Sequence, residues 1–328
     1  MLTKIIVKQL FGLYDYDIDL KNDDGSMAKF VTAPNGYGKT TLLDFVYGVM
    51  TAEYAQLFAI PFQEFQLFYT EDDHNTYRIS ISRSVHQNEQ DEKSDEIEEE
   101  TVKLDFFLTK GFKEESELIE SFSLTKSVTG EVEKDGMSEN TDMFFMARTC
   151  HYITDRRLLN VKTEFGNETL YLQNASMKAY ADDMKRILVS PTLKKEYGQR
   201  IETFKRIIDC CDYAHKQMEI DDRFGIRFVA DDEMETKLSL DNLSSGEKHM
   251  LLQVYELLFK AQQDTLVLID EPELSLHMMW QMNYLKNIEE IISVRGFQCI
   301  VATHSPQIFN SMWSKSIDLF SIASSTEN

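Results

Sequence analysis

Two carboxylates stand directly after an apolar run in the C-terminal half of the chain. The run, residues 265–269 (TLVLI), has no polar alternation, which is typical of a strand buried on both faces of a parallel sheet. Asp270 and Glu271 follow it, and Pro272 ends the strand. Because ligands of open α/β sheets bind beyond the carboxyl ends of the strands, one acid could hold Mg²⁺ and the other could deprotonate an attacking water. A strand followed by a plain acidic turn is the alternative on this segment alone.

A glycine-rich segment near the N-terminus has the pattern of a phosphate-binding loop. Residues 33–41 (APNGYGKTT) follow a predicted strand at residues 29–32 and open a predicted helix. In such a loop, successive backbone N–H groups form a concave anion nest, and the helix N-terminus adds its positive end. We therefore expect the phosphates of a nucleotide to be bound by Asn35, Gly36, Tyr37, Gly38, Lys39, Thr40 and Thr41.

Within this loop, the side chains have separate expected tasks. Lys39 would reach the β- and γ-phosphates, Thr40 would be a ligand of Mg²⁺, and Thr41 would contact the α-phosphate. Ala33 occupies the place of the first glycine of the usual pattern. Since a methyl group fits that place if φ stays negative, we expect a working loop.

A small polar turn before an apolar helix is a second candidate anion site. The turn, residues 243–248 (LSSGEK), has Ser244 and, three residues later, Glu247, which predicts a capping box at a helix start. An ordinary capped helix would explain this turn. In the functional alternative, Ser244, Ser245 and the N–H group of Gly246 form an anion site. The residues alone leave both interpretations open.

Two further candidates follow predicted strands. The strand at residues 298–302 ends in the sequence THSP, so His304 should lie at the same sheet edge as the glycine-rich loop and the paired acids. A lone histidine at such a place is more often structural. Another apolar strand ends in a polar cluster that contains Arg156 and Arg157. Either arginine could contact a γ-phosphate or a neighbouring subunit, and a surface pair on a solvated turn is the equal alternative.

The elements that must position these residues predict an α/β fold. Alternating patterns predict antiparallel strands in a layer beside the nucleotide site, at residues 11–20, 65–69, 77–83 and 102–108. Between residues 175 and 216, two apolar stripes at helical spacing are separated by Pro191, which predicts an αα-hairpin. Short strands are expected near 226–229 and 237–240, and a helix is expected over 276–294. Residues 116–142 are polar with little periodicity and suggest no function.

Composition limits the classes of function. The 328 residues are 42% hydrophobic and 27% charged, as in globular proteins, and neither a signal peptide nor a run of eighteen apolar residues is found. The four cysteines lack CxxC spacing, which indicates buried thiols in a reducing compartment. We therefore expect a cytoplasmic protein without membrane contact.

The net charge of −22 argues against a surface built for non-specific nucleic-acid binding. Residues 89–100 (EQDEKSDEIEEE) are most simply a solvated acidic loop. Residues 148–206, in contrast, hold roughly twelve Lys and Arg against seven Asp and Glu. Local DNA binding therefore stays open.

The four motifs together resemble a known family. Residues 33–41, 243–248, 266–277 and 302–306 stand in the order of the ATP-binding cassette (ABC) ATPase head of transporters, structural-maintenance-of-chromosomes (SMC) proteins and OLD-family defence proteins. The strongest matches (LSSGEK, DEPELSLH, the pair Trp280 and Gln281, and THSP) are similar to compact, AAA-annotated ATPases of bacterial anti-phage systems of the Septu and retron-associated type. The resemblance implies an ABC-type P-loop NTPase head with a mixed central sheet, an N-terminal antiparallel β layer and a helical insert lobe.

The resemblance further implies one domain over residues 1–328. Its first lobe would comprise about 1–155 plus 262–328, and a helical lobe with the signature motif would comprise about 156–261. Two subunits would enclose two ATP molecules, each γ-phosphate being held by Lys39 of one chain and by Ser245 and Gly246 of the other. A loop with Ser275 and His277 would connect the two ATP sites.

The resemblance also implies roles in hydrolysis. Asp270 would hold Mg²⁺ through water, Glu271 would orient and deprotonate the attacking water, and His304 would contact the γ-phosphate. Ser245 and Glu247 stand where the transporter signature has a glycine and a glutamine. This departure favours a defence-type or DNA-repair ATPase over a transport subunit.

Three functions follow as hypotheses. The first is a Mg²⁺-dependent ATPase that forms a homodimer or larger oligomer through ATP and regulates a separately encoded effector, a nuclease, in anti-phage defence. The second is a DNA-repair or chromosome ATPase that clamps DNA through the basic segment 148–206. The third is a nucleotide-gated scaffold with slow, incidental turnover. The sequence identifies neither the effector nor the activating trigger.

Overall fold

The computed structural model describes residues 1–71, 75–87, 100–111, 116–127, 130–136, 150–154, 168–211, 213, 215–274, 276–310 and 312–326. They form two compact units, of which unit 1 comprises Met1–Cys150 and Ile317–Asn328 and unit 2 comprises His151–Ser316. Both units hold strands and helices, so the expected α/β class is confirmed. No helix in the described part of either unit is long and apolar enough to cross a membrane.

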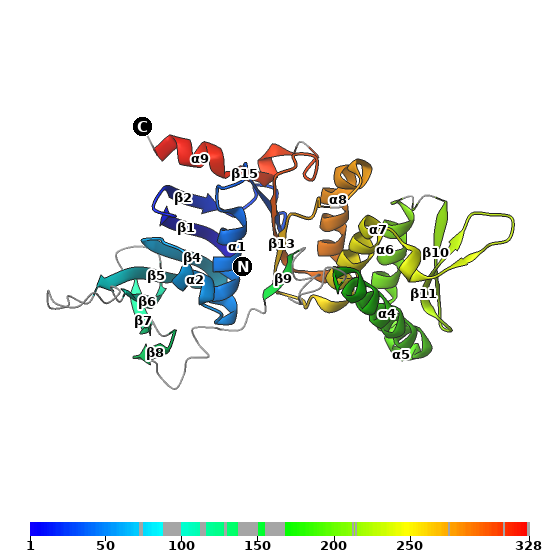
Figure 1. Ribbon diagram of the computed structural model, residues 1–328, viewed down its shortest axis with the longest axis horizontal. Helices are drawn as coiled ribbons and strands as arrows, with labels where there is room; N and C mark the ends of the chain where they lie inside the picture. Colours follow the sequence, from blue (N-terminus) through cyan, green and yellow to red (C-terminus); the bar gives the residue numbers. More distant parts are fainter. Residues whose placement is uncertain are drawn as a thin grey trace. The chain divides into compact units, whose positions relative to one another are not determined.

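A seven-stranded antiparallel sheet is the framework of unit 1 (Figure 1). In pairing order its strands are β2 (Tyr14–Asp19), β1 (Leu2–Leu10), β4 (Glu64–Glu71), β5 (Asn75–Gln87), β6 (Glu100–Lys110), β7 (Glu117–Lys126) and β8 (Val132–Asp135). The expected antiparallel β layer is therefore present. β7 and β8 are an addition to it, because β7 buries only Phe122 and Leu124 and β8 is wholly exposed. Such strands show little of the alternation that marks a half-buried sheet.

The glycine-rich loop of unit 1 lies between a buried strand and a helix. The remaining elements of the unit are β3 (Ala28–Thr32), α1 (Lys39–Thr51), α2 (Ala55–Ala59), β15 (Ser316–Asp318), which neighbours β3, and α9 (Leu319–Thr326). All five residues of β3 are buried. The ring of Phe45 in α1 has its centroid 5.1 Å from that of Phe62 and 5.4 Å from that of Phe65 in β4. The predicted order of strand, loop and helix is confirmed, and aromatic packing fixes α1 against the sheet.

Two parallel strands form the buried centre of unit 2. They are β13 (Leu266–Asp270) and β14 (Gln298–Thr303), and every residue of both is buried. The long helix α8 (Met278–Arg295) connects them, as parallel neighbours require a crossover. In the strand order, β9 (Cys150–Thr154) borders β13 on its other side. The apolar run before the paired acids is therefore a strand buried on both faces, as predicted.

The other helices of unit 2 pack around one aromatic cluster. They are α4 (Glu168–Val189), α5 (Pro191–Glu196), α6 (Gly198–Asp209) and α7 (Ser245–Tyr255), which a π-helical turn, η4 (Glu256–Lys260), extends. The ring centroid of Tyr255 lies 4.4 Å from that of Tyr180 and 5.8 Å from that of Phe204. The expected αα-hairpin is thus present, with the short α5 beginning at Pro191.

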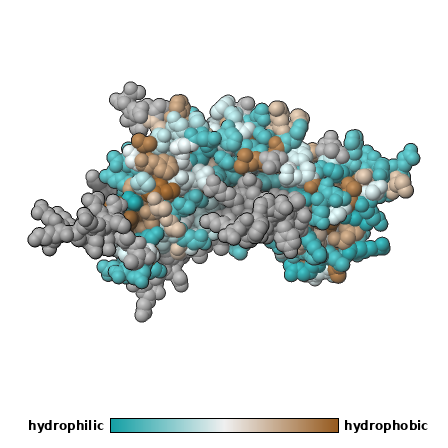
Figure 2. Space-filling model, viewed as in Figure 1, coloured by the Kyte–Doolittle hydropathy of each residue, from teal (hydrophilic) through white to brown (hydrophobic). Residues whose placement is uncertain are grey.

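A small three-stranded sheet packs against α4. Its strands are β10 (Lys216–Asp221), β11 (Gly225–Ala230) and β12 (Lys237–Leu238), and short 3₁₀ turns occur at η3 (Leu240–Asn242) and η5 (Trp313–Lys315). Gly225 has a φ of +76°, and a Cβ atom there would lie 1.8 Å from the carbonyl oxygen of Ala181. Only glycine permits this approach of the β10–β11 turn to α4. Figure 2 shows a mostly hydrophilic surface over unit 2 on the face in view.

Candidate active site

The side chain of Lys39 lies within the curve of the glycine-rich loop. Its Nζ atom donates hydrogen bonds to the carbonyl oxygens of Ala33, at 2.7 Å, and Pro34, at 3.2 Å. Only 5% of the lysine is exposed. The loop therefore wraps around a cation that a phosphate group could also contact.

Positive φ angles shape the same loop. Gly36 and Gly38 have φ of +91° and +79°, and a Cβ atom at Gly38 would lie 2.7 Å from Cδ2 of the buried Leu10. Ala33 does not adopt a positive φ, so the condition for accepting a methyl group at this place is met. The two glycines permit a turn that residues with side chains would strain.

The start of α1 has the features of an anion-binding helix terminus. Its N-cap is Gly38, which makes no side-chain cap, and the first turn contains no acid. Thr40 and Thr41 are both half-buried in this turn. The positive end of the helix is therefore neither capped by a side chain nor opposed by a carboxylate in its first turn.

Aromatic residues hold the loop in place. The carbonyl oxygen of Tyr37 accepts a hydrogen bond of 2.9 Å from the hydroxyl of Tyr16. The ring of Tyr37 stacks on Tyr14, with centroids 5.2 Å apart, and meets Phe320 edge-on at 5.5 Å. The sequence places Tyr37 in the loop but does not reveal these supports, because they come from β2 and α9.

The paired acids occupy the end of β13. Asp270 is its last residue, is 9% exposed and lies opposite Ala302 of β14. Glu271 has φ of +48°, a left-handed conformation that costs a non-glycine residue about 1–3 kcal/mol. Its N–H group donates a 2.8 Å hydrogen bond to the carbonyl oxygen of Ala302. The chain thus turns sharply at Glu271 and keeps a strained conformation at the residue expected to act as a base.

Glu271 and His304 lie together at this edge of unit 2. Nδ1 of His304 is 3.8 Å from Oε1 of Glu271 and 3.0 Å from Oε1 of Glu273. The same oxygen of Glu273 accepts a 2.8 Å hydrogen bond from the backbone N–H of His304. Glu273, which is 6% exposed, therefore orients both the backbone and the ring of His304. With Nδ1 directed at carboxylates, the Nε2 atom is left for a ligand.

Glu273 was not among the predicted site residues. Its signal was the third acid of the sequence DEPE, but the partner is 31 residues away and only the fold joins them. A similar long-range contact is made by Gln281 of α8, which donates to the carbonyl oxygen of Leu276 at 3.1 Å and accepts from the hydroxyl of Ser305 at 2.8 Å. These bonds connect the segment after β13 with the segment after β14. His277 is the N-cap of α8.

The predicted capping box at the start of α7 is confirmed. Ser244 Oγ accepts from the N–H of Glu247 at 3.3 Å, and the Glu247 carboxylate accepts from the N–H of Ser244 at 2.7 Å. Ser244 and Ser245 are exposed, whereas Gly246 is buried. The turn is therefore an ordinary helix cap, and it leaves the side chain of Ser245 exposed at the helix start.

The charge of Glu247 is balanced within unit 2. Nζ of Lys216 lies 2.7 Å from Oε1 of Glu247. Burial alone would raise the pKa of this carboxyl, but the hydrogen bonds from Lys216 and from Ser244 outweigh burial and lower the pKa. Glu247 is therefore ionised at neutral pH, and Lys216 reduces its repulsion of an anion at the helix start.

Two aromatic rings join the start of α7 to the start of α8. The hydroxyl of Tyr213, whose pKa burial raises well above the usual range, donates a 3.1 Å hydrogen bond to the carbonyl oxygen of Glu247. The Tyr213 ring stacks on Trp280, with centroids 5.4 Å apart. Nε1 of Trp280 donates to the carbonyl oxygen of Cys211. The segment with Ser245 is thus linked to the helix that carries Gln281.

The expected site residues fall in both units. Asn35 to Thr41 belong to unit 1, and Ser244 to Gly246, Asp270, Glu271 and His304 belong to unit 2. Arg156, Arg157 and Ser275 lie outside the described residues. No group of three or more His, Cys, Asp or Glu residues that could hold a metal occurs in the described part of the chain. A single carboxylate such as Asp270 nevertheless fits Mg²⁺, which is usually bound by one or two carboxylates together with phosphates and water.

Comparison with known families gives a match over part of the chain. Residues 153–310 match the family described as AAA domain, putative AbiEii toxin, Type IV TA system. The matched segment holds the capped helix α7, the paired acids and His304.

Two curated proteins are similar to part of the chain. Protein ea59 of Escherichia phage lambda is 33% identical over 89 residues, which are 25% of this chain and 17% of that protein. The retron Ec83 probable ATPase of Escherichia coli is 34% identical over 100 residues, which are 26% of this chain and 18% of that protein. The chain thus spans less than a fifth of the length of the curated relatives it matches.

Among solved structures, the SMC head domain from Thermotoga maritima aligns over 96% of this chain and 92% of its own, with 13% identity and a TM-score of 0.44. Another SMC head, bound to the C-winged helix domain of ScpA, aligns over 94% and 90%, with 13% identity and a TM-score of 0.47. Residues 153–310 thus resemble an AAA-domain family, and part of the chain resembles a retron-associated probable ATPase. The resemblance predicted from the four motifs is confirmed at this level.

Proposed function

We propose that the protein is a Mg²⁺-dependent ATPase whose copies associate through ATP and which regulates a separately encoded effector nuclease in anti-phage defence. The observation that carries the proposal is the arrangement at the end of β13. Glu271 is held at a φ of +48° and lies 3.8 Å from His304, which the buried Glu273 orients. Glu235 also has a positive φ, so it is the nearness of Glu271 to His304 and the orientation of His304 by Glu273, not the strain alone, that favour a catalytic role.

Each residue has a defined task in this mechanism. ATP with Mg²⁺ supplies the phosphoanhydride and the charge that activates it, and Thr40 and Asp270 would hold the metal. Lys39, already surrounded by the loop, would neutralise charge on the β- and γ-phosphates. Glu271 would accept the proton of the attacking water, and Nε2 of His304 would donate to the γ-phosphate. Positioning and charge neutralisation supply most of the rate in such phosphoryl transfers.

The start of α7 would serve the ATP of a second copy. Ser245 is exposed there, and its hydroxyl and the N–H of Gly246 would contact the γ-phosphate bound by the partner. The beginning of α8 favours a nearby protein contact, because Met278 and Met279 are each 56% exposed directly after His277. Exposed methionines are common on adaptable binding surfaces. Arg156 is proposed to contact the same phosphate or the neighbouring copy.

The link to defence rests on the relatives. The retron relative is called a probable ATPase, and the family description includes a putative toxin of a toxin–antitoxin system. Since the chain covers less than a fifth of that relative, the effector, the oligomer and the cytoplasmic location are part of the proposal. The division of one ABC-type domain into a lobe at 1–155 plus 262–328 and a lobe at 156–261 is also part of the proposal.

A DNA-clamping ATPase is the second candidate, because a basic surface favours it. Five cations on α4 and α5 are exposed: Lys178, Lys185, Arg186, Lys194 and Lys195. Phosphate groups of DNA would be attracted to such a surface at low salt. A scaffold with slow, incidental turnover is the third candidate.

Measurement of ATP turnover with and without duplex DNA would distinguish these functions. In Glu271→Gln the side chain keeps its size but cannot take up a proton, so turnover should fall about 100-fold or more while an ATP-bound dimer accumulates in light scattering. Glu235→Gln, at another acid with positive φ, is the matched control and should leave turnover unchanged. Normal turnover in Glu271→Gln would disprove the assigned base.

Three outcomes separate the candidates. Turnover that rises with DNA and falls again in Lys194→Glu/Lys195→Glu would favour the clamp. Turnover insensitive to DNA, together with a co-purified nuclease whose activity requires Lys39, would support the regulatory subunit. Nuclease activity unaffected by Lys39→Ala would contradict it.

A further inference from the structure

Unit 1 contains a pocket that the ATPase mechanism does not use. Its volume is about 350 Å³, at the lower end of the range of about 300–1,000 Å³ for ligand pockets. One side is formed by Ala52, Tyr54, Ala55 and Phe58, and the other by Phe122, Leu124, Lys126, Gly130, Val132 and Lys134. It therefore lies between the α1–α2 segment and the last two strands of the sheet.

The walls of the pocket are apolar, and their side chains pack tightly against one another. Phe58, Phe122 and Leu124 are 6%, 3% and 1% exposed. Phe122 stacks on Phe106 of β6 at 4.5 Å, and the ring of Tyr54 lies 4.9 Å from Phe106. Rings held by one another in this way give a firm floor for a large apolar group.

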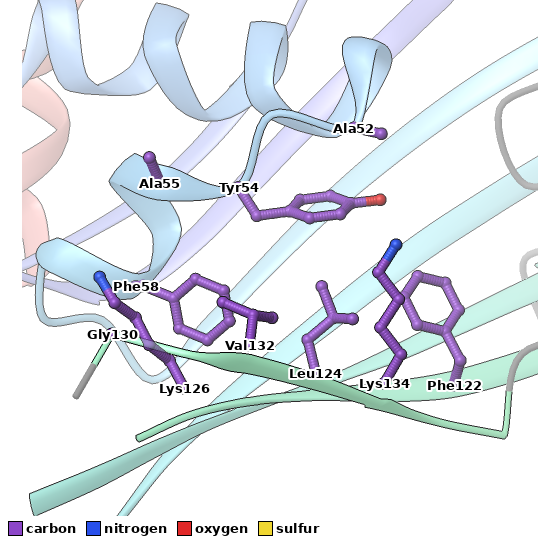
Figure 3. A pocket seen from close by; sticks show the side chains of 10 residues that line it. All are labelled: Ala52, Tyr54, Ala55, Phe58, Phe122, Leu124, Lys126, Gly130, Val132 and Lys134. Carbon is purple, nitrogen blue, oxygen red and sulfur yellow. The ribbon is translucent and has the colours of Figure 1, made fainter. Parts of the chain in front are cut away.

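Two lysines flank this floor. Figure 3 shows Lys126 and Lys134 at opposite sides of the pocket, with Phe58, Val132 and Leu124 between them. Their positions follow from the register of the last strand pair, in which Lys126 lies opposite Val132 and Lys134 lies opposite Leu124. Nζ of Lys126 is 5.9 Å from the centroid of Phe58.

The charges of these lysines suit an external anion. The described residues offer no ion pair to Lys126 or Lys134, although the whole chain has 22 more acids than bases. Two half-buried lysines of the same sheet do have carboxylate partners, Lys4 with Asp17 at 2.8 Å and Lys103 with Asp105 at 2.8 Å. A carboxylate of a ligand beside each lysine would balance the positive charge of that lysine.

The strand β8 adds a third feature. It is the last strand in the order of the sheet, and all four of its residues are exposed. An edge strand offers backbone N–H and C=O groups to another extended segment. A segment paired with β8 would direct every second side chain to the face that holds Val132 and Lys134.

We propose that this pocket binds an extended acidic peptide segment of a protein partner, which pairs with β8. One large apolar side chain of the peptide occupies the space between Tyr54 and Leu124, and flanking carboxylates pair with Lys126 and Lys134. A nucleic-acid strand has phosphates for the lysines, but it lacks the backbone donors and acceptors that extend a sheet. The inference does not depend on ATP hydrolysis, because every residue involved lies outside the proposed active site.

Selection from a library of random ten-residue peptides on the full chain tests this proposal. Peptides with one Phe, Leu or Trp flanked by Asp or Glu should be enriched. A labelled enriched peptide should bind less tightly as salt rises, since its carboxylates face exposed cations. Enrichment of basic or purely apolar sequences would overturn the proposal.

Two variants act on separate features of the pocket. Lys126→Glu/Lys134→Glu should weaken binding of the labelled peptide by about tenfold or more through repulsion, and Ala55→Trp should do so by filling the pocket. Lys110→Glu, at an exposed lysine of β6 outside the pocket, is the matched control for charge and should retain binding. Thermal unfolding of all four proteins should agree within a few degrees.

Competition binding distinguishes an acidic peptide from a small apolar acid or a nucleic acid as the ligand of the pocket. An unlabelled enriched peptide should displace the labelled one, whereas phenylpropionate and a ten-base single-stranded DNA should not at equal concentration. Displacement by either of these probes, or equal peptide binding in the charge-reversed variant, would overturn the assignment. Lys39→Ala should bind the peptide normally, so a failure here is distinct from a failure of the ATPase proposal.

Discussion

Two helix starts in this protein are proposed to contact the same kind of phosphate, and they are built in opposite ways. α1 begins after Gly38 with no side-chain cap and no acid in its first turn. α7 begins with a complete capping box, whose acid, Glu247, is paired with Lys216. A capped helix start is satisfied by its own side chains, whereas an uncapped one depends on water or on an anion.

The difference indicates a division of labour. α1 and its loop can hold phosphate within one chain, because the anion nest, the helix end and Lys39 belong to one segment. α7 is complete without a ligand and, in the proposed assembly, would add the exposed Ser245 to a phosphate held by another copy. α1 should therefore determine ATP affinity, and α7 should determine how fast the bound ATP is hydrolysed.

The largest effect is expected on the α1 side. Lys39→Ala should lower ATP turnover by about 100-fold or more, since it removes the cation that is proposed to face the phosphates. Equilibrium binding of a fluorescent ATP analogue at protein concentrations too low for dimers should be lost as well. Lys110→Ala controls for the removal of one positive charge. Retained binding in Lys39→Ala would mean that α1 does not set ATP affinity.

On the α7 side, neighbouring serines should separate stability from turnover. Ser244→Ala removes the cap and should cost about 1 kcal/mol in the free energy of unfolding. Ser245→Ala should leave that free energy unchanged, because its side chain is exposed, yet lower turnover by about 10- to 100-fold. Chemical denaturation and steady-state kinetics measure the two effects. Loss of ATP binding by monomeric Ser245→Ala would remove the distinction between the helix starts.

The short contiguous motifs are the part of the structure that could be predicted from the sequence. The loop and β13 are contiguous patterns, in which glycine, lysine and paired acids carry their chemistry within nine to twelve residues. Their elements, and the capping box of Ser244 and Glu247, are therefore found in the structure as expected. The assigned roles in catalysis stay predictions.

The features that could not be predicted depend on contacts between distant segments. Glu273 reaches His304, Lys216 reaches Glu247, and Tyr213 meets Trp280, each pair being separated by 31 residues or more in the sequence. The positive φ of Glu271 has no signal either, because glutamate is not a residue that favours it. β8 was missed because an exposed edge strand has no hydrophobic periodicity.

A smaller effect is expected at Lys216, which balances the charge of Glu247 at the start of α7. Lys216→Met should cost about 1–3 kcal/mol at pH 7, because a buried carboxylate loses a charged hydrogen bond. The pKa of Glu247 is lowered in the folded protein, so the pair stabilises the fold above the ordinary carboxyl range and loses this contribution as pH falls through it. The stability difference between wild type and Lys216→Met should therefore shrink as the pH is lowered from neutral into the carboxyl range. Lys185→Met, on the exposed face of α4, should show no such trend.

The smallest expected effect concerns the link from α7 to α8. Trp280→Phe keeps an aromatic ring against Tyr213 but removes the N–H that donates to the carbonyl oxygen of Cys211. Turnover should fall about threefold with unchanged ATP affinity, which is the size of a modest coupling energy. If the rings transmit the state of the α7 start to Gln281, the combined variant with Ser245→Ala should lose less than the product of the two single losses. Trp313→Phe, at an exposed tryptophan of the same unit, is the matched control. Independent, multiplicative losses would show that the two helix starts act without this connection, and the difference between them would then rest on Ser245 alone.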